Sequence, residues 1–310
     1  MTDPASSPDD RDQLTRFLIE DAGVRGVLVH LDETWQQIRQ RATGSPQEGV
    51  IPPASAVALL GEASAAAALF TGHAKVEGRL SVQLRSQTVL RTLFAECTAA
   101  GTLRGIAQLS GDGPVSRDLR ALGDDAILAI TIENPAFGNR EPIRYQGLVA
   151  LDTDSLAGAF EGYFRQSEQL PTRLLLAVDD QRAAGLMLQK LPGDEGDAEG
   201  WNHVGALFDT LGPDELLACD TSTLLTRLFH QEDVRLLGSR PLRFACSCSR
   251  ERVESMLVSL GADEARAAAA DGEAKVRCEF CGEEYRLSSH EIENLLDAAQ
   301  GTHEAPERPQ

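Results

Sequence analysis

The sequence has little positive charge and no long apolar run, and each absence excludes a class of protein. It contains 29 Lys and Arg residues against 48 Asp and Glu residues, which gives a formal net charge of -19. Nucleic-acid binding depends on clustered cations that meet phosphates, so this balance argues against a nucleic-acid partner. No stretch approaches the ~18 uninterrupted apolar residues of a membrane span. We therefore expect neither a nucleic acid nor a membrane as a partner.

The N-terminal residues, MTDPASSPDDRDQL, have neither the basic start nor the apolar stretch of a secretory signal. A cytoplasmic location is the resulting expectation, and thiols are normally kept reduced in that compartment. The six cysteines are then expected to bind metal or to be redox-active, rather than to form a permanent disulfide framework.

The motifs of common enzymes are also missing. The sequence has no GxSxG turn, no phosphate-binding GxxxxGK followed by Ser or Thr, and no HExxH. Asp and Glu residues are plentiful, but no sequence pattern distinguishes a catalytic carboxylate from those of a solvated acidic surface. We identify no catalytic residue and expect that the chain is not an enzyme.

Strand and helix patterns are mixed in the first part of the chain. Alternating or continuous apolar runs predict strands, at residues 24–31, 78–85, 126–133 and 173–178. An Ala-rich stretch predicts a helix from Ser55 to Phe70, and helical spacing predicts another around residues 156–164. Because the strands do not alternate regularly with helices, we expect an α+β fold with mainly antiparallel pairing.

The character of this 310-residue chain changes near Asp180 and again near Pro241, so more than one domain is expected. The acidic, Gly-rich run LPGDEGDAEGW is typical of an exposed connection, and short amphipathic helical patterns follow it. These helices need a surface on which to bury their apolar sides. The sequence does not decide whether these patterns are ordinary core helices or parts of a mobile linker. The tail after Gly301 is expected to be disordered.

Four of the cysteines form two close pairs near the end of the chain. Cys246 and Cys248 lie in FACSCSR, and Cys278 and Cys281 lie in RCEFCGEEY. Four thiolates at such spacings can close a tetrahedral zinc site. A disulfide within the CxC pair would depart from relaxed geometry and would be readily reduced, so the cluster is also a candidate redox switch. A permanently closed zinc site is the alternative.

The segment around these cysteines offers few large apolar groups. Ser249 can cap a helix that ends at Gly261, and Ser288 with Glu291 forms a capping-box pattern. About sixty residues with so small a core are marginal alone, so we expect that the metal is needed for folding. The other two cysteines, Cys97 and Cys219, are expected to be small buried residues.

A family resemblance follows from these motifs. FACSCSRERVESMLVSLG followed by CEFCGEEYRL resembles the zinc-binding domain of the 33-kDa heat-shock protein family of redox-regulated holdase chaperones. Other segments of this chain also resemble segments of that family, in the same order: RGVLVHLDETW, GEASAAAALF, GRLSVQLRS, RYQGLVALDTDSLAGAFEGYFRQSEQLPTRL and AAGLMLQKLP. Small departures, such as the single Gly in AAGLMLQ, affect turns of the core and leave all four cysteines matched.

The resemblance implies three parts and a tail: a dimerising core at 1–180, a metastable helical linker at 181–240, a zinc domain at 241–300 and a tail at 301–310. It also implies an ATP-independent holdase that is inactive while its four clustered cysteines, Cys246, Cys248, Cys278 and Cys281, bind one Zn2+. Oxidation would form the Cys246–Cys248 and Cys278–Cys281 disulfides and release the zinc. The linker would then unfold, and the protein, as a homodimer, would hold unfolding client proteins.

Two other functions remain as alternatives. A thiol–disulfide oxidoreductase using Cys278 and Cys281 would need a low thiolate pKa, which the acidic neighbours Glu279, Glu283 and Glu284 oppose. A zinc-ribbon protein that binds nucleic acid would need a basic face, which this sequence lacks.

Overall fold

The computed structural model describes residues 11–44, 52–136, 141–193 and 198–301. The chain divides into two compact units, Met1–Ala245 and Cys246–Gln310. Antiparallel sheets and helices make up both, which confirms the expected α+β class. The boundaries expected near residues 180 and 240 stay predictions. The tail beyond residue 301 and the centre of the acidic connection, residues 194–197, lie outside the described residues.

The larger unit contains a five-stranded, wholly antiparallel sheet. Its strands in spatial order are β10 (Val234–Pro241), β1 (Gln13–Ile19), β2 (Val24–Leu31), β9 (Ala183–Lys190) and β8 (Thr172–Val178). The strands predicted at 24–31 and 173–178 are confirmed as β2 and β8. The first strand pairs with the last one of this sheet, and the hydroxyls of Thr15 and Ser239 lie 3.0 Å apart across that pair.

A six-stranded sheet forms the second layer of this unit. Its strands in spatial order are β11 (Arg243–Phe244), β5 (Thr102–Leu109), β4 (Leu90–Thr98), β3 (Arg79–Arg85), β6 (Ile127–Asn134) and β7 (Ile143–Val149). Only the short β11 pairs in parallel among the described strands. The predictions at 78–85 and 126–133 are confirmed as β3 and β6.

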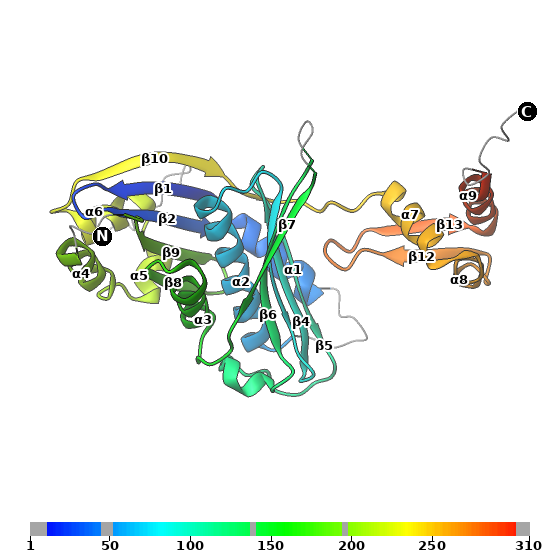
Figure 1. The fold of residues 1–310 in the computed structure, drawn as a ribbon. Helices are drawn as coiled ribbons and strands as arrows, with labels where there is room; N and C mark the ends of the chain where they lie inside the picture. The colour runs from blue at the N-terminus through cyan, green and yellow to red at the C-terminus, as the bar shows by residue number, and fades with distance from the viewer. Residues whose placement is uncertain (1–10, 45–51, 137–140, 194–197, 302–310) are drawn as a thin grey trace, which may run out of the picture. The chain divides into compact units, whose positions relative to one another are not determined.

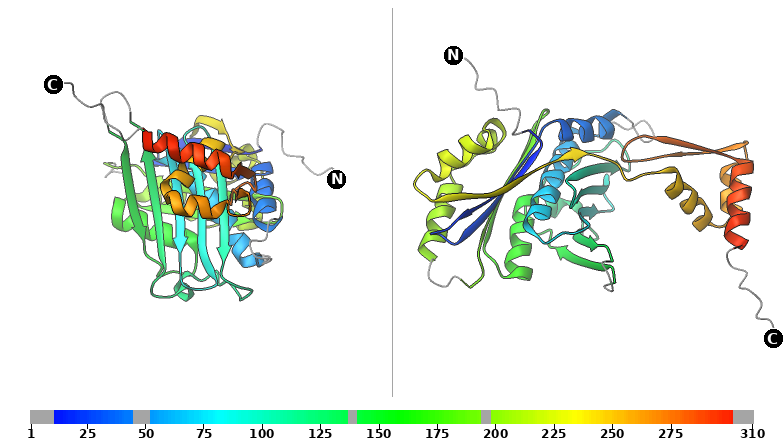
Figure 2. Two further views of the ribbon diagram at one scale, coloured as in Figure 1. Left: turned by 90° about the vertical axis from the view of Figure 1, so that its right-hand side faces the viewer. Right: turned by 90° about the horizontal axis from the view of Figure 1, so that it is seen from above.

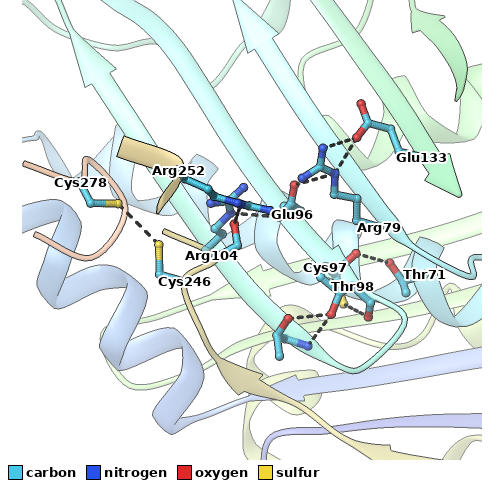
Figure 3. Close-up of polar contacts among 12 residues, drawn as sticks. Thr71, Arg79, Glu96, Cys97, Thr98, Arg104, Glu133, Cys246, Arg252 and Cys278 are labelled. Carbon is cyan, nitrogen blue, oxygen red and sulfur yellow. Dashed lines mark hydrogen bonds and ion pairs between the residues drawn. The ribbon is translucent and has the colours of Figure 1, made fainter. Parts of the chain in front are cut away.

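Charges of alternating sign cross four strands of this second sheet, as Figure 3 shows. Arg104 pairs with Glu96 on the neighbouring strand at 3.0 Å, and Glu96 lies 3.7 Å from Arg79. Arg79 also pairs with Glu133 on β6. Glu96 lies directly opposite Arg104, and Arg79 lies directly opposite Glu133, whereas Arg79 and Glu96 are diagonal neighbours. These pairs support the strand register.

Helix α2 (Ala54–His73) runs between the two sheets (Figure 1) and confirms the Ala-rich helix predicted from Ser55 to Phe70. Its length and composition alone would allow a membrane span, yet 78% of its most apolar window is buried inside the protein. Small residues let strands approach closely: a Cβ at Gly61 would lie 2.4 Å from a Val178 methyl carbon. Helix α2 is therefore the central helix of a core with sheets on both sides.

The remaining helices of the larger unit lie around these layers. They are α1 (Glu33–Gly44), the 3-10 helix η3 (Leu119–Leu122), α3 (Leu156–Tyr163), the π-helix η4 (Phe164–Glu168), α4 (Ala198–Phe208), α5 (Pro213–Ala218) and α6 (Thr221–Phe229). The second predicted helix, around residues 156–164, corresponds to α3 and the start of η4.

Both faces of the five-stranded sheet are buried along β2 and β9, whereas the edge strand β10 is mostly exposed. Along β2, Val27 and Val29 belong to the core with α2, whereas Leu28 belongs to a second apolar cluster with α4, α5 and α6. Figure 2, seen from above, shows these three helices and α2 on opposite sides of the sheet. The amphipathic helical patterns beyond Asp180 are thus packed helices in this structure. Of the two alternatives, core helices and a mobile linker, the structure shows core helices that cover one face of the sheet.

The smaller unit is a hairpin with three helices. Its elements are α7 (Arg250–Leu260), α8 (Ala262–Ala268), β12 (Glu273–Arg277), β13 (Glu284–Ser288) and α9 (Ser289–Gly301). The predicted caps are confirmed: the Ser249 hydroxyl accepts from the Arg252 N–H, and Ser288 and Glu291 exchange side-chain to backbone hydrogen bonds. Eight buried apolar residues form its core, three of them alanines: Val253, Leu257, Ala265, Ala269, Ala274, Leu287, Ile292 and Leu296.

Candidate metal centre

The four clustered cysteines lie at the ends of elements of the smaller unit. Cys246 and Cys248 precede α7, Cys278 follows β12, and Cys281 precedes β13. The turn between the strands is closed by two backbone hydrogen bonds, in which Cys278 N–H donates to Glu283 O and Gly282 N–H donates to Cys278 O, both at 2.8 Å. Gly282 has φ 78°, a conformation that glycine adopts without strain.

All four sulfur atoms lie within 4.8 Å of one another, and none is in a disulfide. Cys246 Sγ is 3.6 Å from Cys278 Sγ (Figure 3), and Cys248 Sγ is 3.3 Å from Cys281 Sγ. Sulfurs bound to zinc at about 2.3 Å in a tetrahedron would be separated by about 3.8 Å. The donor set and its spacing therefore fit a tetrathiolate zinc ion.

Ionisation of the cluster is uneven. Burial disfavours the Cys246 thiolate, but hydrogen bonds from Cys248, Cys278 and Cys281 outweigh it and lower the pKa of the Cys246 thiol. Burial raises the pKa of the Cys278 and Cys281 thiols. Ionisation of the Cys278 and Cys281 thiols is therefore favoured by a compensating cation such as a divalent metal ion. The raised pKa values also oppose a nucleophilic role for the CxxC pair.

Two polar side chains next to the cysteines were not singled out from the sequence. The Tyr285 hydroxyl donates a hydrogen bond to Cys248 Sγ at 3.2 Å, and Arg252 Nη1 donates to Ser247 Oγ at 2.8 Å. Tyr285 reaches the cluster because β13 pairs with β12 and carries its side chain to the hairpin's cysteine end. The sequence signal would have been a hydroxyl-bearing residue four positions after Cys281.

We expect the Tyr285→Phe variant to bind zinc about tenfold or more weakly, because partners of metal ligands orient them and stabilise their charge. Competition with a chromophoric chelator on the reduced protein measures this. Tyr145→Phe removes a hydroxyl from the larger unit instead and should leave zinc affinity unchanged. Equal affinity of Tyr285→Phe and the unmodified protein would show that the hydrogen bond has no role in metal retention.

The other two cysteines are placed as the sequence predicts. Cys97 and Cys219 are both buried, Cys97 in β4 and Cys219 at the end of α5. Burial raises the pKa of the Cys97 thiol to about 11. Within the described ranges, the four-cysteine cluster is the single group of three or more potential ligands close enough to hold a metal ion.

Comparisons with known proteins agree with this arrangement. A family model described as "Hsp33 protein" matches residues 12–288. The 33 kDa chaperonin of Ectopseudomonas mendocina is 43% identical over 292 residues, covering 92% of this chain and 95% of the relative. The 33 kDa chaperonin of Azotobacter vinelandii is 42% identical over 295 residues, covering 93% and 95%.

The fold is also that of a solved relative. The crystal structure of the 33 kDa chaperonin of Thermotoga maritima has a TM-score of 0.76 to this chain at 20% identity. The superposition covers 94% of this chain and 99% of that one. The match of nearly the whole chain to the family model, with relatives near 40% identity over most of their length, means that the chain belongs to the Hsp33 family.

Proposed function

We propose that this protein is a redox-regulated, ATP-independent holdase chaperone that zinc keeps inactive. Cys246, Cys248, Cys278 and Cys281 would hold one Zn2+ under reducing conditions, such as those of the cytoplasm. Oxidation would convert them into the disulfides Cys246–Cys248 and Cys278–Cys281 with release of the ion. The protein would then bind unfolding clients as a homodimer, without enzymatic turnover.

One observation supports this proposal most strongly: the four thiols of two separate motifs lie close together, in a unit whose apolar core is small. Their mutual distances fit tetrahedral zinc. A structural zinc ion supplies about 10–16 kcal/mol of apparent binding free energy in small zinc-dependent domains. The core of this unit has only eight buried apolar residues among those the structure describes. Loss of the ion would therefore remove the main stabilisation of this unit.

A client-binding surface can be derived from the larger unit. Helices α4, α5 and α6 cover one face of the five-stranded sheet, and Phe17, Leu28 and Leu186 lie beneath them. Detachment of these helices would expose a continuous apolar surface, which partly unfolded chains bind. The segment 198–229 is thus the part of the proposed linker whose unfolding would create a binding site.

The test compares zinc-loaded reduced protein with peroxide- or hypochlorite-treated protein. We expect only the oxidised form to suppress light scattering by a thermally aggregating enzyme, with zinc release rising in parallel over the oxidant titration. Far-UV circular dichroism should show a loss of helix at the same oxidant concentrations. Equal suppression by both forms, with zinc retained in both, would contradict the switch. Catalytic turnover of insulin disulfides would instead favour an oxidoreductase.

A further inference from the structure

A second feature of the larger unit is a cavity of about 260 Å³ between the two sheets, near the end of α2. Aromatic rings form much of its wall. The Phe164 ring lies 5.3 Å from the Phe70 ring, 5.5 Å from the Tyr163 ring and 5.6 Å from the His73 ring, all in edge-to-face arrangements. Phe164 begins the π-helix η4, an irregularity that is frequent at functional sites. The cavity has room for one small ring.

Arg25 of β2 brings a positive charge into this wall. Its Nη2 donates to Gln189 Oε1 at 2.5 Å and to His73 Nε2 at 2.9 Å, and both of these acceptors are neutral. Its Nε is buried and has no hydrogen-bond partner in the described structure. No ion pair within 4.0 Å joins Arg25 to a described carboxylate, although the charge of Glu168 acts on it from farther away. A half-buried cation of this kind lacks a close counter-ion.

His73 adds a second buried donor. Burial, reinforced by the Arg25 charge, lowers the pKa of His73 to about 3, so the imidazole is neutral at physiological pH. Since Nε2 accepts from Arg25, the proton of the neutral ring is on Nδ1. That Nδ1 is buried and has no hydrogen-bond partner among the described residues. A buried donor without an acceptor costs free energy. An acceptor bound in the cavity could pair with these donors.

Two tyrosines complete the polar part of the wall. The hydroxyls of Tyr145 and Tyr163 lie 3.0 Å apart, and Tyr163 packs directly over Gly147, where a Cβ would lie 2.3 Å from its hydroxyl oxygen. Because one hydroxyl can donate to the other, the second keeps a proton for a further acceptor. Lys75 also lines the cavity, although its side chain is 90% exposed and lies 4.0 Å from Glu77. Among the described residues, Glu168 is the one carboxylate that lines it. Donors and positive charge therefore predominate.

We propose that this cavity binds a small aromatic carboxylate, whose ring packs among Phe70, Tyr163 and Phe164 and whose carboxylate pairs with Arg25. An apolar cavity with a few convergent polar groups is the usual form of a small-molecule site. The guanidinium fork is suited to a carboxylate, and the anion would supply the counter-charge that Arg25 lacks. The residues of this site all belong to the larger unit and include none of the clustered cysteines, so the inference does not depend on the proposed chaperone function.

The test uses the full-length, reduced, zinc-loaded protein with benzoate as the probe. Saturation-transfer NMR and calorimetry should detect benzoate with millimolar or tighter affinity, as expected for so few heavy atoms. Benzyl alcohol and acetate lack the charge and the ring, respectively, and each should bind at least about tenfold more weakly. Arg25→Met should weaken benzoate binding about tenfold to a hundredfold.

Two further variants keep the result interpretable. Arg235→Met makes the same change at an exposed arginine that pairs with Glu20, and it should leave benzoate binding unchanged. Ile132→Phe fills the cavity from β6 and should abolish binding while leaving Arg25 in place. The proposal is overturned if benzoate does not bind, if benzyl alcohol binds equally well, or if both the folded Arg25→Met and Ile132→Phe variants bind benzoate normally. Near-UV circular dichroism establishes that each variant is folded.

Discussion

The Cys278→Ser variant is expected to lose stoichiometric zinc and to unfold from residue 246 to residue 301, while the larger unit stays folded. Three remaining thiolates cannot close the tetrahedron, so most of the ~10–16 kcal/mol of apparent metal-binding free energy is lost. What remains is a core of eight buried residues, too small to offset the entropy of ordering the 56 residues from 246 to 301. Hydrogen exchange read by mass spectrometry should show full exchange in α7, α8, α9 and the hairpin.

The matched control is Cys219→Ser, which removes a buried thiol of the larger unit that has no place in the cluster. This variant should retain zinc, and the smaller unit should remain protected from exchange. A chelator added to the unmodified reduced protein should reproduce the exchange pattern of Cys278→Ser. Wild-type protection of α7 and α9 in Cys278→Ser would mean that the unit folds without its metal, and the proposed switch would lose its physical basis.

The Phe229→Ala variant is expected to hold client proteins while still reduced and zinc-bound. Phe229 ends α6, is 1% exposed, and its ring lies 6.2 Å from the Phe17 ring on the sheet. Truncating a buried phenylalanine to alanine costs about 3–5 kcal/mol. Helices α4, α5 and α6 are short and attach to the sheet through this cluster, so the loss falls on their docking before the rest of the unit unfolds. Light scattering by an aggregating client, measured without oxidant, checks this.

Phe160→Ala provides the comparison, because Phe160 is equally buried but packs against Phe70 in the core with α2. The Phe160→Ala variant should lower the melting temperature by a similar amount, but helices α4, α5 and α6 should stay packed on the other face of the sheet. Reduced Phe160→Ala should therefore remain inactive below its melting temperature. If both variants suppress aggregation equally, general destabilisation rather than helix detachment exposes the binding surface.

Local features of the fold could be predicted from the sequence. The capping pattern at Ser288 and Glu291 involves atoms three residues apart, so spacing alone determines it. The alternation in β3 likewise reports which side of a strand faces the core. The CxxC motif is also local, because the turn between β12 and β13 carries both of its cysteines. The meeting of Cys246 and Cys248 with this pair is non-local, but zinc chemistry predicts it from the spacings, because four thiolates are needed to close one tetrahedral site.

Non-local features could not be predicted. Strand β2 is buried on both faces, so its residues are apolar with little alternation, and nothing in them indicates which partner covers which face. The pairing of β1 with β10 joins segments separated by most of the chain. The cavity beside α2 combines Arg25, His73 and Tyr145 from three different elements, each unremarkable in its own sequence context. The Tyr285 hydrogen bond was missed because it depends on hairpin register.

The pairing of the first strand with a strand near residue 240 has a consequence for synthesis. Thr15 and its partner Ser239 are separated by 224 positions, so β1 cannot complete its pairing until that much chain has been made. At roughly 5–20 residues per second, this takes about 10–45 s on the ribosome. Until residue 229 has been made, α4–α6 are absent or incomplete, and the apolar face of β1 and β2 that they cover is exposed. Each nascent copy would thus expose the surface proposed to hold clients until residues 198–229 have been made.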